Sequence, residues 1–182
     1  ELNIIIKKHN LNKGVAAARN TGNKIARGDI LMYLDGDDFL HKVCVANCIQ
    51  GFSNPEIGFV YSEHAEVKSN TNLFYSERDI ISISRKQNLD VAKYLRGIIP
   101  GVGHIKTVRK SVNIPFDETF VTAQDTNWWL KLALNGINFY HIPKVLYFWR
   151  RGIESISSSR VTREECNRNH ERAVKEALKT IT

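Results

Sequence analysis

Three aspartates directly follow an apolar run. Residues 30–34 read ILMYL, and Asp35, Asp37 and Asp38 come next, with Gly36 between the first two. An apolar run of this length predicts a strand that is buried on both faces. Clustered carboxylates at the end of a buried strand repel one another and need a counter-charge. Mg²⁺ and Mn²⁺ prefer oxygen ligands, and open α/β sheets bind ligands at the carboxyl ends of their strands, so we expect a metal–phosphate site there.

Spacing separates this metal–phosphate site from two of its alternatives. An EF-hand loop that starts at Asp35 would need glycine at its sixth position and glutamate at its twelfth, where the chain has Leu40 and Ala46. A phosphatase of the aspartyl-phosphate type would usually carry threonine two residues beyond its second aspartate, where Phe39 stands. A third alternative is a solvated turn in which one aspartate caps the following helix. The cluster by itself leaves this third alternative open.

Length and composition limit the class of protein. A chain of 182 residues with 42% hydrophobic residues predicts one domain, or one domain with an appendage, and a sizeable core. No apolar run approaches the length of a membrane span. Three cysteines fit a reducing compartment, so we expect a cytoplasmic location. The net charge of +7 favours polyanionic partners, and no motif indicates nucleic acid among them.

The elements that must position the acidic cluster follow an α/β pattern. Residues 3–8 predict a strand, residues 15–26 a helix with a narrow face of small side chains, and residues 30–34 the next strand. This order predicts a parallel strand–helix–strand crossover. Further strands are expected at residues 57–62, 105–109, 138–142 and 145–149, and further helices at residues 42–52, 89–96 and 126–135.

A last amphipathic helix is expected from Thr162, which forms a capping box with Glu165. Its basic side chains suit an anionic membrane surface, which would place the protein at the inner face of the plasma membrane. The alternative is that this helix packs on the domain or on a second copy in a homo-oligomer. The basic residues are Arg160, Arg163, Arg168, Arg172, Lys175 and Lys179.

Further short sequences surround the acidic cluster in a fixed order. Before it come NKG at residues 12–14, ARNTG at 18–22 and ARGD at 26–29. After it come FDE at residues 116–118, QDTNWWLKLA at 124–133, IP at 142–143, WRR at 149–151 and SIS at 155–157. In order and spacing, residues 3–158 resemble the family 2 glycosyltransferases. The resemblance implies the GT-A fold, a mixed α/β sheet with helices on both faces, for residues 1–158, followed by a C-terminal helix at residues 159–182.

Such enzymes move a sugar from a nucleotide diphosphate donor to an acceptor hydroxyl with inversion. The resemblance therefore implies transfer of a hexose or N-acetylhexosamine, with a UDP-sugar as the expected donor. A saccharide or lipid-linked saccharide is the implied acceptor, and bacterial surface polysaccharide synthesis is the implied setting. The alternative is a nucleotide-sugar binding module without catalysis. Two departures from the family pattern favour it: Gln124 replaces a common glutamate, and Gly152 replaces a histidine that many members carry.

The DGD sequence at residues 35–37 matches the family's DxD motif. This match implies that Asp37 binds the Mn²⁺ or Mg²⁺ that holds the diphosphate, and that Asp35 faces the ribose or the metal. Such a metal would act as a Lewis acid on the leaving nucleotide diphosphate. For Asp38 two roles stay open: a further outer ligand, or the cap of the next helix.

Asp125 matches the general base of the family's Glu-Asp motif. Direct displacement at the anomeric carbon needs one carboxylate that accepts the proton of the acceptor hydroxyl. Because Gln124 precedes it in place of glutamate, a second negative charge is missing. A helix N-cap at the start of residues 126–135 is the alternative for Asp125. Trp128 and Trp129 are expected in the core, with one of them lining the acceptor site as the alternative.

Basic residues complete the set that the resemblance implies. Arg19 would approach the donor, and Arg150 or Arg151 would lie near the diphosphate. His104 would contact a donor or acceptor sugar, or serve the fold alone. The strand, helix and strand that hold the nucleotide base in this family would precede Glu1, which is no initiating methionine. A piece of a longer protein is therefore expected, with full-length protein as its active form.

Overall fold

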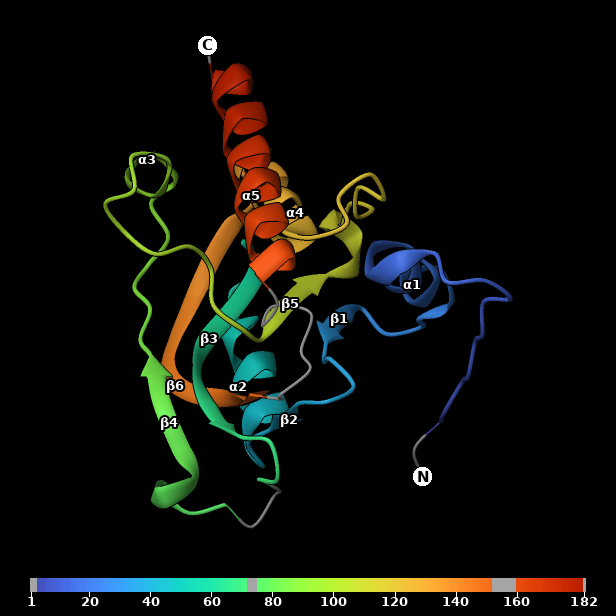
Figure 1. Ribbon diagram of the computed structural model, residues 1–182, viewed down its shortest axis with the longest axis vertical. Coiled ribbons are helices and arrows are strands. Elements are labelled where there is room, and N and C mark those ends of the chain that lie inside the picture. The colour runs from blue at the N-terminus through green and yellow to red at the C-terminus, as the bar shows by residue number, and fades with distance from the viewer. Residues whose placement is uncertain (1–2, 72–74, 152–159, 182) are drawn as a thin grey trace.

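The computed structural model describes residues 3–71, 75–151 and 160–181 (Figure 1). Its centre is a mixed sheet of six described strands, in which β3 and β6 run parallel and the other pairs are antiparallel. Across the sheet lie β1 (Ile30–Tyr33), β5 (Lys106–Arg109), β3 (Ile57–Lys68), β6 (Asn138–Arg151) and β2 (Phe39–Leu40). β4 (Ile80–Ser84) pairs with the second half of β3. The mixed α/β sheet that the sequence predicts is confirmed.

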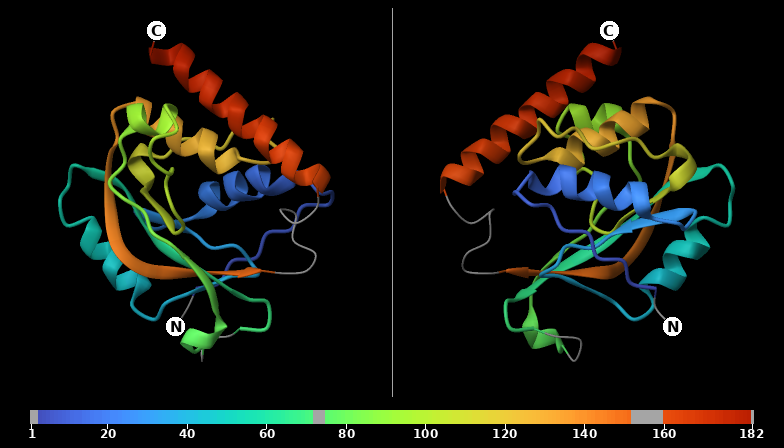
Figure 2. Two further views of the ribbon diagram at one scale, coloured as in Figure 1. Left: turned by 60° about the vertical axis from the view of Figure 1, so that its left-hand side comes forward. Right: turned by 90° about the vertical axis from the view of Figure 1, so that its right-hand side faces the viewer.

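Helices cover both faces of this sheet (Figure 2). One face carries α1 (Gly14–Ile25), α3 (Val91–Leu95), α4 (Gln124–Leu134) and α5 (Arg160–Ile181), and the other carries α2 (Cys44–Gly51). Short 3₁₀ helices lie at Glu77–Asp79 and Lys110–Val112. Trp128 and Trp129 of α4 are both buried in the hydrophobic core between the sheet and these four helices. The prediction that both tryptophans lie in the core is confirmed, and neither indole ring is exposed to line an acceptor site.

β6 is one continuous strand where the sequence predicts two. Its register against β3 shifts from Ser62 opposite Ile142 to Glu63 opposite Val145, so Pro143 and the residue after it have no partner in β3. Proline has no N–H to donate to the ladder and is accommodated at such bulges. Figure 2 shows that β6 is bent. Its second half pairs with β2, where Phe148 lies opposite Phe39, the residue that follows the acidic cluster.

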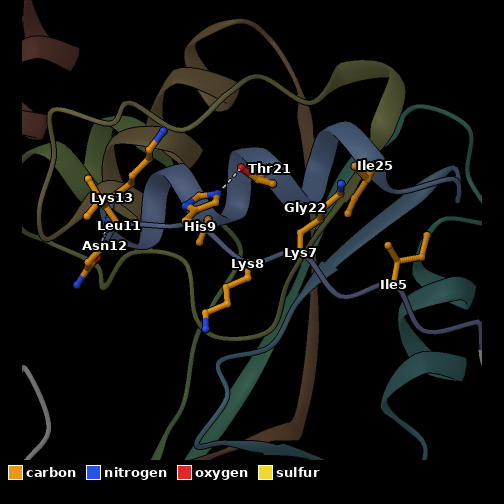
Figure 3. A pocket seen from close by; sticks show the side chains of 12 residues that line it. Ile5, Lys7, Lys8, His9, Leu11, Asn12, Lys13, Thr21, Gly22 and Ile25 are labelled. Atoms are coloured by element: carbon orange, nitrogen blue, oxygen red, sulfur yellow. Dashed lines mark hydrogen bonds between the residues drawn. The ribbon is translucent and has the colours of Figure 1, made fainter.

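Residues 3–8 do not form the strand that their apolar pattern predicts. The segment is extended, its three isoleucines are exposed, and it runs beside α1, where His9 is hydrogen-bonded to Thr21 at 2.9 Å (Figure 3). A strand needs a partner for its N–H and C=O groups, and no described strand pairs with this segment. The predicted crossover to residues 30–34 is therefore wrong here, because a side-chain pattern does not supply the pairing partner.

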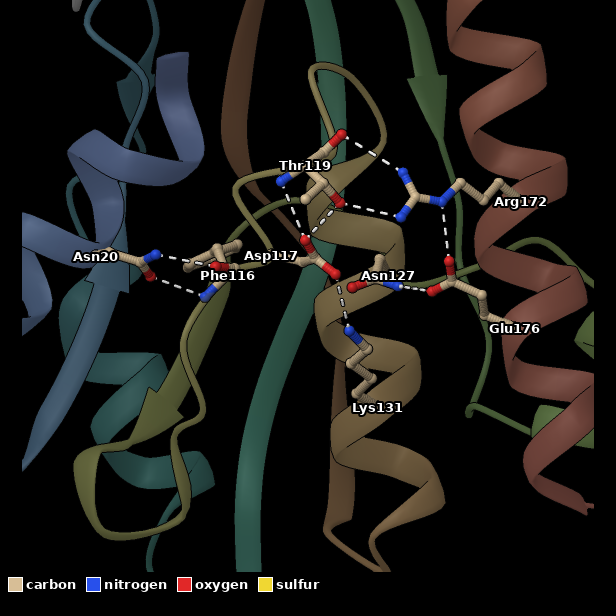
Figure 4. A network of polar contacts seen from close by, with 8 residues as sticks. All are labelled: Asn20, Phe116, Asp117, Thr119, Asn127, Lys131, Arg172 and Glu176. Carbon is tan, nitrogen blue, oxygen red and sulfur yellow. Dashed lines mark hydrogen bonds and ion pairs between the residues drawn. The ribbon is translucent and has the colours of Figure 1, made fainter. Parts of the chain in front are cut away.

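α5 packs against α4 through an apolar seam that has polar contacts at its edge (Figure 4). Two alanines of α5 are buried in the seam. Arg172 donates to Glu176 at 2.9 Å and to the Thr119 hydroxyl at 3.0 Å, and Asn127 donates to Glu176 at 3.2 Å. The last helix therefore packs on the domain. The capping box predicted at Thr162 lies outside the described side chains.

Gly103 allows two backbones to approach closely just before β5. A Cβ atom at Gly103 would lie 2.3 Å from the Ser62 carbonyl oxygen of β3. The neighbouring His104 carbonyl accepts the Ser62 N–H at 3.1 Å, which holds the two segments together. Glycine is required at this position because any side chain would collide with the backbone of β3.

We expect Gly103→Ala to lower the free energy of unfolding by about 1–3 kcal/mol, because a rigid backbone carbonyl must move to admit the methyl group. Urea denaturation followed by circular dichroism measures this loss. Gly22→Ala is the matched control, since a Cβ at Gly22 meets no atom within 4 Å and alanine favours the helix. Equal stability of the Gly103→Ala and wild-type proteins would contradict the close approach.

Candidate active site

The acidic cluster lies at the carboxyl end of β1 and is tied to β6 by Asp38. This side chain is 8% exposed. Its carboxylate accepts the Tyr147 hydroxyl and the Arg150 N–H, the latter at 3.0 Å. Burial raises the pKa of Asp38, and the two hydrogen bonds oppose that rise. The helix-cap alternative is wrong, because α2 begins only at Cys44. With both carboxylate oxygens accepting hydrogen bonds, an outer-ligand role for Asp38 gains no support.

Asp35 faces α1, where Arg19 donates to its Oδ1 at 2.8 Å. The Arg19 guanidinium also lies 5.4 Å from the ring of Phe116. The next residue of α1, Asn20, exchanges two hydrogen bonds with the backbone of Phe116, at 2.8 and 2.9 Å (Figure 4). These contacts fix α1 between the acidic cluster and the loop before α4. The two adjacent residues of the sequence ARN thus have different partners: Arg19 binds Asp35, and Asn20 binds the backbone of Phe116.

Asp37 presents the free carboxylate of the cluster. It is exposed, and its side chain makes no hydrogen bond or ion pair with the described part of the chain. Its carbonyl oxygen accepts the Arg150 guanidinium at 2.7 Å, and the same guanidinium donates to the Thr71 carbonyl at 2.7 Å. Arg151 instead makes a two-point ion pair with Glu66, at 2.9 and 3.0 Å. Of the two candidate arginines, Arg150 is the one beside the acidic cluster.

Asp125 lies in the first turn of α4 and is not its N-cap. The helix begins at Gln124, and its N-cap is Ala123, whose φ of 53° is left-handed. The Asp125 carboxylate accepts the N–H of its own neighbour Thr126 and pairs with Lys106 Nζ at 2.9 Å. Burial alone would raise the pKa of Asp125, but the Lys106 ammonium holds it below its ordinary value. The carboxylate is therefore ionised at neutral pH.

A small hollow joins the acidic cluster to the Asp125 ion pair. It is lined by Arg19, Asp35, His104, Lys106 and Tyr147, together with two aromatic rings. The sheet creates this meeting, because Tyr33 of β1 lies directly opposite Lys106 of β5. Residues that are up to 128 positions apart in the chain thus line one space. The hollow presents two cationic side chains, Arg19 and Lys106, and the carboxylate of Asp35, and Lys106 connects it to Asp125.

His104 forms part of the wall of this hollow. Its ring stacks on Tyr147 at 4.8 Å and on Trp149 at 5.9 Å, and the ring of His64 meets it edge-on at 4.7 Å. Burial, followed by the charge of Lys106, sets the pKa of His104 well below its ordinary value. The imidazole is therefore neutral at physiological pH and serves as an apolar wall with polar edges.

The buried His64 predicts a loss of stability in mild acid. Burial lowers its pKa from 6.5 to about 4, so below pH 6.5 the unfolded chain binds a proton that the folded chain does not. The stabilisation is complete above pH 6.5 and is lost as the pH falls from 6.5 to about 4, by on the order of 2–3 kcal/mol. Urea denaturation at several pH values measures this loss. His64→Asn should make the pH dependence shallower without removing it, because the pKa of His104 is also lowered by burial. A pH dependence as steep as that of the wild-type protein would contradict this account.

Lys106 and Tyr147 are site residues that the sequence analysis misses. Lys106 is the single charge within the apolar stretch at residues 105–108, and this placement is the signal that could have singled it out. Tyr147 gives no such signal, because an aromatic residue in a predicted strand is expected in the core. Neither residue is close in sequence to its partner, since Lys106 pairs with Asp125 and Tyr147 with Asp38 across the fold.

The residues at the acidic cluster fit a divalent cation that arrives with a diphosphate. No cluster of three or more histidine, cysteine, aspartate or glutamate side chains suited to a metal occurs among the described residues. Mg²⁺ sites of nucleotide enzymes commonly use one or two carboxylates plus substrate phosphates. The free carboxylate of Asp37 and the second oxygen of Asp35 supply that donor set. No helix in the described ranges is long and apolar enough to cross a membrane.

Residues 1–114 match the model of glycosyl transferase family 2, and the chain therefore belongs to this family. It is 26% identical, over 86% of its length, to an Escherichia coli relative named UDP-Glc:alpha-D-GlcNAc-diphosphoundecaprenol beta-1,3-glucosyltransferase WfaP. It is 27% identical, over 93% of its length, to Escherichia coli chondroitin synthase. The chain spans 59% of the first relative and 24% of the second.

Solved structures with a similar fold include S. aureus TarS 1-349. Its complex with UDP-GlcNAc superposes on 92% of this chain, which covers 53% of TarS 1-349, with a TM-score of 0.59 at 17% identity. Its complex with UDP superposes on 91% of this chain and 51% of its own, with a TM-score of 0.57 at 15% identity. At this level of identity the likeness concerns the fold, and it confirms the GT-A class that the sequence predicts.

Proposed function

We propose that this chain carries the catalytic core of a metal-dependent inverting glycosyltransferase. Its donor is a UDP-sugar that carries a hexose or N-acetylhexosamine, and its acceptor is a saccharide or lipid-linked saccharide hydroxyl. The observation that carries the proposal is the single hollow bounded by the Arg19–Asp35 and Lys106–Asp125 ion pairs. Family membership supports it, as do the UDP-sugar in the name of the glucosyltransferase relative and the UDP and UDP-GlcNAc bound in the TarS structures.

The acidic cluster is the donor side of the proposed site. Asp37 and Asp35 hold Mn²⁺ or Mg²⁺, which supplies Lewis-acid stabilisation of the leaving diphosphate when bound. Arg19 orients Asp35 through the 2.8 Å ion pair. Arg150 fixes the backbone of Asp37, and its position beside the cluster supports a contact with the donor phosphates.

Asp125 is the general base on the acceptor side. Its ionised carboxylate pairs with Lys106, which lines the hollow. Such a carboxylate can accept the proton of the attacking hydroxyl, which is what a single displacement with inversion requires. In this proposal the transferred sugar lies between Asp125 and the acidic cluster. His104 and Tyr147, which stack at 4.8 Å, form the wall that this sugar would contact.

The setting we propose is surface polysaccharide synthesis at the cytoplasmic face of a bacterial membrane. The diphosphoundecaprenol acceptor in the name of one relative supports a lipid-linked substrate. The exposed side of α5 carries basic residues that suit anionic lipid: Arg163, Arg168, Lys175 and Lys179. Contact between two copies of the chain through α5 is the alternative use of this surface.

Release of UDP from UDP-glucose and UDP-GlcNAc tests the proposed function. The full-length protein should release UDP in the presence of Mn²⁺. This release should stop when EDTA removes the metal, because the leaving diphosphate then loses its counter-charge. Binding of both donors without release would instead favour the non-catalytic binding module. Release that is equally fast in EDTA would contradict metal dependence.

A further inference from the structure

Lys106 is the more deeply buried member of the ion pair at the proposed base. Its side chain is 10% exposed, and that of Asp125 is 31% exposed. Withdrawing an ammonium group from water costs several kcal/mol unless a partner charge and hydrogen bonds compensate. Within the described residues, Asp125 is the carboxylate in ion-pair contact with Lys106. The buried position of Lys106 therefore depends on Asp125.

Among the described residues, the other carboxylate that faces Lys106 is Asp35, which lines the same hollow but is paired with Arg19 at 2.8 Å. The charge of Lys106 lowers the pKa of a histidine in β3, of a histidine just before β5 and of a lysine just after β4. The charge of an arginine in α1 lowers the pKa of Asp125, and the charge of Asp125 raises the pKa of a tyrosine in α3. These groups are His64, His104, Lys86, Arg19 and Tyr94. In such surroundings the attraction of Lys106 is directed to a single carboxylate.

Stability alone does not explain a lysine at this position. Replacing a buried ion pair by apolar residues of similar volume often leaves a protein equally or more stable. Val108, two residues further along β5 and on the same face, is an ordinary buried core residue. Lys106 lines the hollow together with Asp35 and Tyr147 and pairs with Asp125 at 2.9 Å, so it connects the side of the proposed metal ligand Asp35 to the proposed base.

We propose that Lys106 is a positioning residue for sugar transfer, which holds the Asp125 carboxylate toward the hollow as an ionised proton acceptor. This inference rests on the proposed function. In the transfer, the acceptor oxygen forms a bond to the anomeric carbon and its proton moves to Asp125. The bond from that carbon to the diphosphate oxygen breaks, and its electron pair leaves with the diphosphate. Lys106 remains protonated and changes no bond.

Lys106→Met and Lys106→Arg form the matched pair of variants, with Lys106→Gln as a second neutral variant in case methionine impairs folding. The readout is the pH profile of UDP release from UDP-glucose and UDP-GlcNAc with Mn²⁺. Without the ammonium group, burial raises the pKa of Asp125. The acid limb of the profile, where the rate falls because Asp125 becomes protonated, should therefore move to higher pH. At pH 7 we expect kcat to fall about 10–100-fold through lost orientation, with KM for the donor within about twofold. Arginine should keep the acid limb in place.

A second readout is independent of turnover. The ¹³Cγ resonance of Asp125 should titrate at higher pH in the neutral variants than in the wild-type and arginine proteins. An unchanged titration, an unmoved acid limb, or a raised KM with unchanged kcat would overturn the positioning role; the last result would make Lys106 a donor-binding residue. If the wild-type protein releases no UDP, the proposed function fails with the positioning role, and the titration still reports whether the ion pair exists.

Discussion

Asp37→Asn should abolish the Mn²⁺-dependent binding of UDP, with a loss in affinity of about 100-fold or more. The reason is the donor set at the acidic cluster. Asp38 uses both carboxylate oxygens for Tyr147 and Arg150, and Asp35 shares one oxygen with Arg19. Of the three, Asp37 has the carboxylate with no hydrogen bond or ion pair to residues 3–71, 75–151 and 160–181. Isothermal titration of UDP with and without Mn²⁺ measures the effect.

The control for this variant is Asp29→Asn, an exposed aspartate six residues before the cluster. It should bind UDP as the wild-type protein does and should show the same enhancement by Mn²⁺. Circular dichroism should show all three proteins folded, because the exposed carboxylate of Asp37 contacts no described side chain. If Asp37→Asn kept the enhancement by Mn²⁺, the metal would be held elsewhere and the assignment of the DxD motif would be wrong.

Asp125→Asn should lower kcat by about 10³-fold while leaving the affinity for UDP and Mn²⁺ within about twofold. General base catalysis contributes roughly 10²–10⁴-fold, and an amide of the same shape cannot accept the proton. Lys106 holds the pKa of Asp125 below its ordinary value, so the carboxylate loses its proton at low pH and stays ionised as the pH rises. The wild-type rate should therefore show no acid limb of Asp125 near neutral pH.

Asp117→Asn is the matched control for the base. Asp117 precedes α4 and pairs with Lys131 of that helix at 3.3 Å (Figure 4), whereas Asp125 pairs with Lys106, which lines the hollow. Loss of this ion pair should leave kcat unchanged. If both aspartate variants lost activity equally, the loss would reflect the stability of α4, and if Asp125→Asn kept wild-type turnover, the base would be another group.

Local pattern was sufficient for the parts of the fold that depend on neighbours in sequence. The apolar run at residues 30–34 forms the strand β1, and the acidic cluster follows it. The prediction that this strand is buried on both faces is wrong: β1 ends the order of the described strands, Leu31 is its one buried residue, and Leu34 is exposed. The apolar pattern does not show which strand lies at the edge of the sheet. The predicted helices at residues 42–52, 89–96 and 126–135 correspond to α2, α3 and α4, with ends that differ by one or two residues. Residues 3–8 have an equally clear pattern but no described partner strand, and the pattern alone could not reveal that.

In the candidate site, too, some residues could be predicted from local sequence and others depend on pairing across the sheet. The aspartates at positions 35, 37 and 125 could be selected from their types and from the family resemblance. Their supporting residues could not, because register across the sheet decides them. Lys106 lies beside the acidic cluster because Tyr33, two residues before Asp35, lies opposite it. Asp38 receives the Tyr147 hydroxyl only because Phe39 pairs with Phe148. These pairings join residues more than 70 positions apart.

A crystal structure of the protein with UDP and Mn²⁺ tests the central claim most directly. We predict a Mn²⁺ ion bound by Asp37 and by oxygens of the diphosphate at about 2.1 Å, with Asp125 on the opposite side of the hollow. UDP bound away from the acidic cluster, or a metal held without Asp37, would contradict the account.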